Sequence, residues 1–181
     1  MRNLKKNLKE AMNSSPDKAV YFFDESRFGT KSKLGYGWFP KGIRTVVPVK
    51  LGFQNFYVYS AVNAIVGDNF SLIVPRVNTV LMNVFLREMF QYLGETQAII
   101  VMDCAGWHKS KDLVVPDNIE IIYLPPYSPE LNPTERWWQY LKRHTLKNKV
   151  YDTLDMLEDM VCEFIRNCDM QTLRQICSLN Y

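Results

Sequence analysis

Long hydrophobic runs are missing from this sequence of 181 residues. No stretch approaches the roughly 18 consecutive apolar residues that a membrane-spanning helix needs. The N-terminal residues are rich in lysine and lack the apolar centre of a signal peptide. We therefore predict a cytoplasmic protein that makes no contact with a membrane.

Cysteine and histidine are scarce as well. The four cysteines form no Cys-x-x-Cys pair and there are only two histidines, so the pattern of a zinc site is missing. We predict that the thiols are reduced and mostly packed; they belong to Cys104, Cys162, Cys168 and Cys177. With 47% hydrophobic residues, the chain has the composition of a globular domain that needs no disulfide to fold.

The length argues for one folded domain. Residues 1–18 are polar, and Ser14, Ser15 and Pro16 interrupt any helix that precedes them. We interpret this segment as a tail or the remnant of a linker. The folded domain is expected over residues 19–181.

Acidic residues are absent from two stretches of the chain. Residues 26–67 hold six cations and no acid, and residues 136–149 hold five cations and no acid. Residues 151–169, in contrast, hold six acids and one arginine, although the whole chain has a net charge of only +3. Such blocks indicate an anionic partner at two places on the molecule.

The pattern of apolar residues predicts a mixed α/β domain, in which helices pack against a sheet. Apolar runs predict strands over 19–24, 56–65, 69–74, 98–103 and 119–124, and glycines among aromatic residues predict hairpin strands within 29–50. Helical spacing predicts helices over 79–93, ending at Gly94, over 133–147, and over 154–165.

The start of the second predicted helix is marked by a distinctive segment. Prolines at 125, 126 and 129 rule out a helix there, so the chain runs extended and then turns. Asn132 is a favourable N-cap, Pro133 suits the first helical position, and Glu135 stands where the acid of a capping box is found.

Three carboxylates stand at the ends of predicted elements. Asp24 and Asp103 each end a buried strand, and Glu135 lies in the first turn of a helix. If the two strands are neighbours, the three acids converge, and a divalent cation is the usual remedy for their repulsion. Oxygen ligands without thiolate or imidazole favour Mg²⁺ or Mn²⁺. Two such ions clamp the attacking and leaving oxygens of a phosphoryl transfer.

Three segments resemble the DDE transposases of bacterial insertion sequences in the mariner superfamily. They are Phe-Phe-Asp-Glu-Ser-Arg-Phe-Gly at 22–29, Met-Asp-Cys-Ala-Gly-Trp-His at 102–108, and Leu-Pro-Pro-Tyr-Ser-Pro-Glu-Leu-Asn-Pro-Thr-Glu-Arg at 124–136. The third is the most specific, and the resemblance covers about residues 20–150. Members usually carry an N-terminal helix-turn-helix region as well, whereas this chain begins just before the catalytic domain.

The resemblance implies a ribonuclease H-like fold, with Asp24, Asp103 and Glu135 as a triad that binds two Mg²⁺ or Mn²⁺ ions. It implies DNA cleavage at the transposon ends, followed by strand transfer into target DNA. It also implies a homodimer, because two DNA ends must be held, and a nucleoid-associated location in the cytoplasm.

Further residues are candidates for DNA contact. His108 matches the family's histidine, Arg136 neighbours the glutamate, and Lys142 extends the basic run on the same predicted helix. The predicted DNA-binding set is Arg27, Lys31, Lys33, Lys41, Arg44, His108, Lys109, Arg136, Arg143 and Lys147.

Each of these signals has a structural alternative. Glu135 can complete the capping box, His108 can be a satisfied structural residue, and the lysines can protect a sheet edge. Trp137 and Trp138 are expected in the core rather than on bases. Glu25 follows Asp24 directly and is expected on the opposite face of its strand, outside the triad.

Two other functions remain open at this point. A DNA-binding or oligomerisation module without activity, left by a fragmented element, predicts salt-sensitive DNA binding with no need for a divalent metal. Another ribonuclease H-like nuclease, acting on hybrids or junctions, is the third hypothesis.

Overall fold

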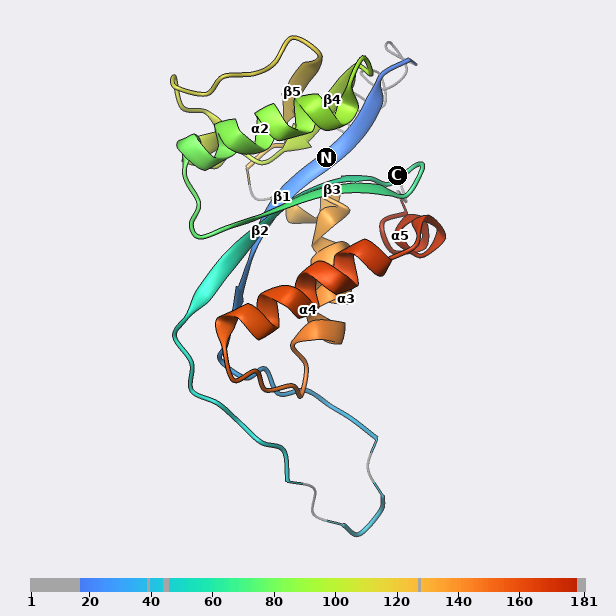
Figure 1. Ribbon diagram of the computed structural model, residues 1–181. Coiled ribbons are helices and arrows are strands. Elements are labelled where there is room, and N and C mark those ends of the chain that lie inside the picture. The colour runs from blue at the N-terminus through green and yellow to red at the C-terminus, as the bar shows by residue number, and fades with distance from the viewer. Residues whose placement is uncertain (1–16, 39, 44–45, 127, 179–181) are drawn as a thin grey trace.

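A computed structural model describes residues 17–38, 40–43, 46–126 and 128–178 (Figure 1). Its centre is a five-stranded sheet of order β3-β2-β1-β4-β5. The strands are β1 (Ala19–Gly29), β2 (Asn55–Asn63), β3 (Asp68–Val74), β4 (Ala98–Met102) and β5 (Ile119–Tyr123). The first three strands are antiparallel, whereas β4 and β5 run parallel to β1. The predicted mixed sheet is therefore confirmed.

Strand β1 is the middle of this sheet and is longer than the sequence pattern predicts. It pairs with β4 from Ala19 to Phe22 and with β2 from Phe22 to Gly29. Because side chains alternate along a strand, Tyr21 and Phe23 face one side of the sheet, and Phe22 and Phe28 face the other. The strand therefore carries core residues of both layers.

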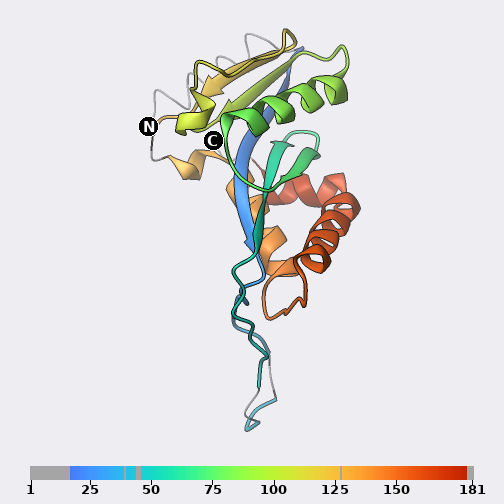
Figure 2. The same ribbon diagram turned by 60° about the vertical axis from the view of Figure 1, so that its left-hand side comes forward.

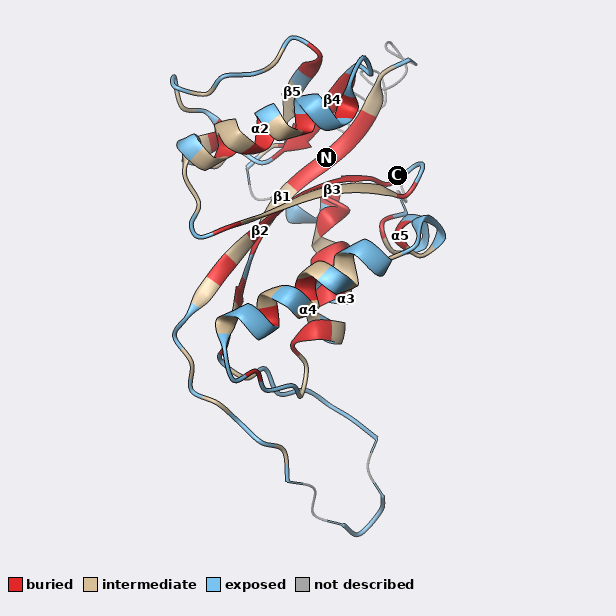
Figure 3. Cartoon of the chain, in the orientation of Figure 1, coloured by how far each residue is buried: buried red, intermediate tan, exposed pale blue. Residues whose placement is uncertain are grey.

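Helices cover both faces of the sheet. Helix α2 (Thr79–Leu93) packs on the Phe23 face through Met82, Phe85 and Met89. Helices α3 (Thr134–Thr145), α4 (Leu154–Asn167) and α5 (Met170–Ile176) lie together on the other face (Figure 1). Trp137 of α3 is fully buried in the second core. Figure 3 shows the buried residues concentrated along the sheet and on the inner sides of these helices.

Helix boundaries follow local chemistry. The side chain of Asn78 accepts from the Leu81 amide at the start of α2, and Gly94 ends that helix with φ of 58°. Thr153 caps α4 in the same way. The two predicted helices at 79–93 and 154–165 are therefore confirmed. Helix α5 was not predicted; it is short, and Asp169 caps it.

The segment between β1 and β2 differs from the prediction. Its described residues form no strand, and a single isolated bridge joins Lys33 to Lys147. We call the described residues of the range 30–54 the arm, because they project away from the sheet as two adjacent passes of chain (Figure 2). The passes are joined near the sheet, where Thr30 N–H donates to Gln54 O and Ser32 N–H donates to Lys50 O. The predicted hairpin strands are wrong because few cross-strand bonds form beyond this root.

Other predictions concern single groups or the chain ends. Cys104, Cys162, Cys168 and Cys177 are all free thiols, in line with the prediction. Residues 1–16, most of the predicted tail, lie outside the described residues. Within the ranges that the structure describes, no helix is long and apolar enough to cross a membrane.

Candidate active site

The register of the sheet brings two of the predicted carboxylates to the same place. Strand β1 pairs with β4 in parallel, with Phe22 opposite Val101. Continuing that register by two residues along each chain sets Asp103 beside Asp24. Asp24 still belongs to β1, where it pairs with Ser60 of β2, whereas Asp103 begins the loop after β4.

Two buried side chains fasten the start of α3 to this end of β1. The Asn132 amide Nδ2 donates to Phe23 O at 2.9 Å, and the Thr134 hydroxyl donates to Phe22 O at 2.7 Å. Glu135 follows directly, in the first turn of the helix. The proline-rich segment therefore delivers this carboxylate to the strand that carries Asp24.

The capping-box alternative for Glu135 is not what the structure shows. Asn132 Oδ1 does accept from the Thr134 amide at 3.1 Å, but α3 begins at Thr134 with Pro133 at its N-cap, one residue later than the cap predicted at Asn132. The Asn132 backbone N–H, however, donates to Pro129 O at 2.9 Å, which takes the donor that a capping glutamate needs. The carboxylate of Glu135 is directed to the pocket instead.

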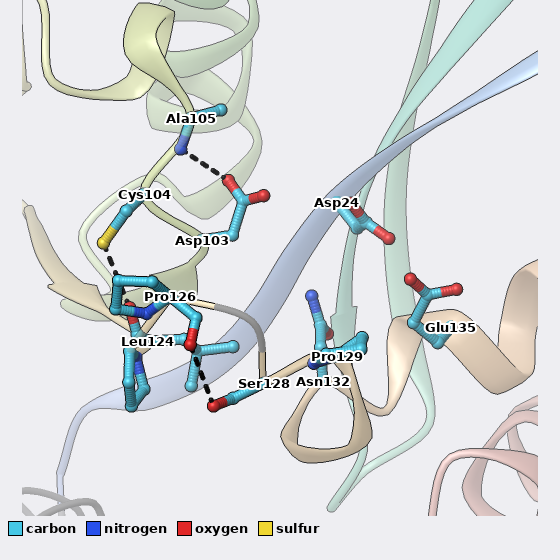
Figure 4. A pocket seen from close by; sticks show the side chains of 11 residues that line it. Asp24, Asp103, Cys104, Ala105, Leu124, Pro126, Ser128, Pro129, Asn132 and Glu135 are labelled. Atoms are coloured by element: carbon cyan, nitrogen blue, oxygen red, sulfur yellow. Dashed lines mark hydrogen bonds between the residues drawn. The ribbon is translucent and has the colours of Figure 1, made fainter.

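One pocket of about 460 Å³ collects the three acids. Asp103 and Cys104 form one wall, Asp24 and Glu135 form another, and residues of the proline-rich segment close a third side (Figure 4). Its lining residues are Asp24, Asp103, Cys104, Ala105, Leu124, Pro125, Pro126, Ser128, Pro129, Asn132 and Glu135. None of these described lining residues is cationic.

Electrostatic repulsion is visible at Asp24. Burial raises the pKa of this carboxyl to about 7, and the negative charges of Glu25 and Glu135 contribute to the same rise. Two hydrogen bonds act in the opposite direction: Trp138 Nε1 donates to Asp24 Oδ2 at 2.9 Å, and the backbone of Glu25 makes the other. Trp138 is buried, as predicted, and its polar edge supports the carboxylate.

Asp103 is more exposed, but two donors hold one of its oxygens. The Ala105 amide donates to Oδ1 at 3.0 Å, and His108 Nδ1 lies 2.7 Å from the same atom. Burial by itself lowers the pKa of His108, but the hydrogen bond and charge of Glu25, together with Asp103, outweigh it and raise that pKa.

The donor set fits a hard divalent cation in its chemistry. Carboxylate oxygens are the preferred protein ligands of Mg²⁺ and Mn²⁺. In the described part of the chain, no three His, Cys, Asp or Glu side chains stand close enough together to hold one ion. The charge of Glu135 nevertheless raises the pKa of Asp24, and such repulsion is what a bound cation relieves.

Comparison with known proteins identifies the family. The model for DDE superfamily endonucleases matches residues 19–158, which is most of the chain. The chain belongs to this family. A curated relative, the uncharacterized protein y4pE/y4sA of Sinorhizobium fredii strain NGR234, is 36% identical over 107 residues, or 59% of this chain and 79% of that protein.

Solved structures of the Mos1 transposase share the fold of this DDE superfamily member. The Mos1 paired-end complex with the left transposon end has a TM-score of 0.69 and 16% identity, over 96% of this chain and 55% of that chain. The Mos1 mariner paired-end complex with Mn has a TM-score of 0.70 and 15% identity, over 96% and 56%. The chain thus spans about half the length of these transposases. The ribonuclease H-like fold and the membership of the DDE endonuclease superfamily agree with the predictions.

This DDE superfamily member has a second pocket, of about 450 Å³, at the root of the arm. Positively charged side chains line it, and we call it the basic pocket. Arg27 of β1, Lys31 and Lys33 of the arm, and Lys142 of α3 all line it. Burial lowers the pKa of Lys142, as does the neighbouring charge of Lys33, while Glu135 and Asp24 act in the opposite direction. The two pockets are adjacent, because β1 carries both Arg27 and Asp24 and α3 carries both Lys142 and Glu135.

Some of the remaining predicted DNA-binding cations lie on the arm or on α3, near the basic pocket, and others lie elsewhere. Lys41 is exposed on the arm, Arg143 is exposed on α3, and Lys147 follows α3, with its side chain packed close to the arm at Gly35. Lys109 is exposed, with Nζ 4.8 Å from the centre of the Tyr123 ring. Arg44 lies outside the described residues.

The side chains of two predicted DNA-binding residues interact with other groups of the protein instead. His108 is only 1% exposed and lies between Asp103 and Glu25, which corrects the expectation of a phosphate contact and matches the structural alternative. Arg136 donates through Nε to Ile176 O and through its NH2 group to Ser178 O, so its guanidinium binds the C-terminal end of α5.

Sequence reasoning missed the role of two contacts. Strand alternation correctly predicted that Glu25 faces away from the carboxylate pocket. It gave no sign that Glu25 meets the His108 side chain on that opposite face of the sheet. The contact between Trp138 and Asp24 was also missed, because it joins residues far apart in sequence. A signal was available for Lys142, since a residue seven positions after Glu135 lies on the same helical face.

Proposed function

We propose that this domain cleaves and joins DNA strands by metal-dependent phosphoryl transfer, as the catalytic domain of a transposase. The observation that carries the proposal is the single pocket lined by Asp24, Asp103 and Glu135, which come from β1, the loop after β4 and the start of α3. Membership of the DDE endonuclease family and the transposase-like fold support it.

The three carboxylates are proposed as ligands for two Mg²⁺ or Mn²⁺ ions. When bound, such ions supply a nucleophile at neutral pH and stabilise both the attacking and the leaving oxygen of an in-line displacement. The protein's part is to hold the ligands: Trp138 fixes Asp24, Ala105 fixes Asp103, and the junction at Thr134 places Glu135. A Mos1 paired-end complex with Mn and another with Mg support this choice of metal.

The basic pocket is proposed to hold the phosphates of the DNA strand beside the carboxylates. Lys142 lies on the same helix as Glu135, seven residues further on, and lines the basic pocket, so it is well placed to bind the strand next to the reacting phosphate. Arg27, Lys31 and Lys33 extend this surface to the arm. Transposon ends and target DNA are the proposed substrates, and a homodimer is proposed because two ends are joined.

The first test is Mn²⁺ binding by calorimetry on the wild type and on Glu135→Gln. We expect the variant to lose at least about 10-fold in affinity while its thermal unfolding stays close to that of the wild type, because no capping bond depends on the carboxylate. Glu130→Gln is the matched control, since Glu130 is an exposed acid in the neighbouring short helix η2 (Pro129–Leu131).

Nuclease assays complete the test. Wild type with Mg²⁺ should cut duplex DNA that carries the element's ends, and Asp103→Asn and Glu135→Gln should reduce the rate by at least about 100-fold. Unchanged cleavage in both variants would reject the triad. Preferential cutting of RNA–DNA hybrids or junctions would instead assign the site to another nuclease class.

A further inference from the structure

The imidazole of His108 is buried between two carboxylates from different parts of the fold. Its Nδ1 lies 2.7 Å from Asp103 Oδ1, and its Nε2 lies 3.4 Å from Glu25 Oε2. His108 ends a short 3₁₀ helix (η1, Gly106–His108), whereas Glu25 belongs to β1. The ring thus connects the loop that carries Asp103 to the central strand.

The orientation of this ring is fixed on several sides. Phe23 meets it edge-on, with the ring centres 5.4 Å apart, and Trp107 does so at 5.7 Å. The Tyr123 hydroxyl donates to the His108 carbonyl oxygen at 2.6 Å, which holds the backbone of the same residue. Such packing leaves the imidazole one way to present its two nitrogens.

Glu25 contacts the imidazole on the side opposite Asp103. Its side chain is 14% exposed, and its Oε2 and His108 Nε2 are both buried, 3.4 Å apart, and make no hydrogen bond within the described structure. Buried polar atoms without partners are costly, so two of them facing each other indicate a specific pairing. Glu25 therefore keeps Nε2 turned toward β1, which leaves Nδ1 for Asp103.

This arrangement orients the carboxylate of Asp103, whose side chain is 58% exposed. The terminal torsion of an exposed aspartate is broad, so little else restrains the carboxylate group. Here Oδ1 is engaged by both His108 and Ala105, and the second oxygen remains available to the pocket. Figure 4 shows this second oxygen on the side of Asp103 that faces Asp24.

We propose that Glu25 and His108 are positioning residues, which hold the Asp103 carboxylate in the orientation needed for metal binding. This inference rests on the proposed function. Adjacent residues of β1 then serve the site from both faces of the sheet: Asp24 lines the pocket directly, and Glu25 acts through His108 on the carboxylate across it.

Two substitutions of the same histidine separate positioning from packing. In His108→Asn the amide nitrogen takes the place of Nδ1 and keeps a donor for Asp103, whereas in His108→Gln it takes the place of Nε2 and faces Glu25. Both remove the ring. Glu25→Gln tests the contact between Glu25 and His108. Its control is Glu120→Gln, since Glu120 is an exposed acid on β5.

The measurement is Mn²⁺ affinity by calorimetry, with thermal unfolding of every variant. We expect His108→Gln to weaken binding by about 10- to 100-fold, as for other residues that support metal ligands. His108→Asn should stay within about threefold of the wild type, and Glu25→Gln should fall between them. Glu120→Gln should bind like the wild type.

Three results would overturn the inference. If the wild type binds Mn²⁺ and His108→Gln binds equally well, Asp103 needs no support from His108. If His108→Asn loses as much affinity as His108→Gln, the ring acts only through packing. If the wild type binds no Mn²⁺, the proposed metal site itself fails, which is a distinct outcome.

A readout on the wild-type ring guards against variants that do not fold. The chain has two histidines, so His144→Gln leaves the imidazole NMR signals of His108 alone. Adding Mg²⁺ should shift those signals with the same dissociation constant that calorimetry with Mg²⁺ gives for this variant. Signals that stay constant at saturating Mg²⁺ would contradict a link between His108 and the bound carboxylate.

Discussion

The hydroxyl of Thr134 is completely buried and donates to Phe22 O, close to Asp24 on the same strand. Asn132 makes the parallel contact with Phe23 O. These two contacts lie where the pairing of β1 with β4 ends, at Phe22, while its pairing with β2 continues to Gly29. The first turn of α3 is thereby tied to the strand, and Glu135 gains a fixed position relative to Asp24.

Replacing Thr134 with valine tests this junction. The valine keeps the shape of the side chain but leaves Phe22 O without its donor, so we expect the free energy of unfolding to fall by about 1–3 kcal/mol. Mn²⁺ affinity should fall as well, because Glu135 follows the junction. Urea unfolding and calorimetry measure the two effects.

Thr96→Val is the control for that substitution, because the side chain of Thr96 is exposed in the connection between α2 and β4. Its unfolding free energy should change by less than about 0.5 kcal/mol. A decrease in Thr96→Val equal to that in Thr134→Val would show that the junction has no special role.

Single residues were predictable where chemistry and spacing acted along the chain. Asp24, Asp103 and Glu135 could be chosen because each stands at the end of an element predicted from the sequence; β1 in fact continues past Asp24 to Gly29, but all three acids line one pocket. The partners of His108 and Trp138 could not be predicted, since those interactions depend on how distant segments pack. Burial of His108 could not be deduced from a histidine in a loop.

Three elements meet at the carboxylate of Asp68. Tyr21 of β1 donates to its Oδ2 and Tyr92 of α2 donates to its Oδ1, each at 2.6 Å, while Asp68 itself begins β3. Burial, and then the bond to Asp68, raise the pKa of both tyrosines, that of Tyr92 to about 12. The cluster fastens α2 to the β2–β3 hairpin on one face of the sheet.

An alkaline decline in stability follows from these elements. Burial also raises the pKa of Tyr59 to about 12, against 10.0 for an ordinary tyrosine. Below about pH 10 these groups are protonated in both states and stability is unaffected. Between about pH 10 and pH 12 the unfolded chain releases protons that the folded chain retains, so stability falls as pH rises.

Urea unfolding at several pH values checks this prediction. The free energy of unfolding of the wild type should fall steadily across the alkaline interval. That of Tyr59→Phe should fall less steeply, because this variant lacks one of the tyrosine protons that the folded chain retains. Parallel curves for the two proteins would show that Tyr59 does not titrate between the folded and unfolded states as described.

Elements with a strong local pattern were predicted well, and the others were not. The helix at 79–93 combines apolar spacing with the stop at Gly94, and the buried strands are continuous apolar runs. The arm carries similar aromatic residues, yet strands need a partner with matching hydrogen bonds, which local pattern does not supply. Helix α5 escaped because seven residues are too few for a periodic signal.

Charge is distributed unevenly over the whole molecule. The basic pocket collects Arg27, Lys31, Lys33 and Lys142 where the arm meets the sheet. The acids of residues 151–169 lie mainly on α4, which packs on α3 as the outer helix of its layer. A polyanion is therefore attracted to the arm root and repelled from the outer helix.

The salt dependence of DNA binding measures this arrangement. For a short duplex, the slope of log K against log salt concentration should become shallower by roughly 0.9 for each phosphate that the protein no longer neutralises. The double variant Lys31→Gln, Lys33→Gln should therefore reduce the slope by roughly 2, as seen by fluorescence anisotropy. Lys18→Gln is the control, because Lys18 pairs with Glu120 at 2.8 Å. An unchanged slope in the double variant would place the DNA elsewhere.

The arm connects, along the chain, the residues of the pocket that precede it to those that follow it. Asp24 precedes it in the chain, and Asp103 and Glu135 follow it, while the sheet pairing of β1 with β2 and β4 is independent of the arm's tip. A chain divided near Lys41 would still offer every pairing that builds the sheet. Asp24 would then reside on a small peptide and the other two acids on a large fragment, so assembly of the pocket would become a bimolecular reaction that depends on the concentration of both pieces.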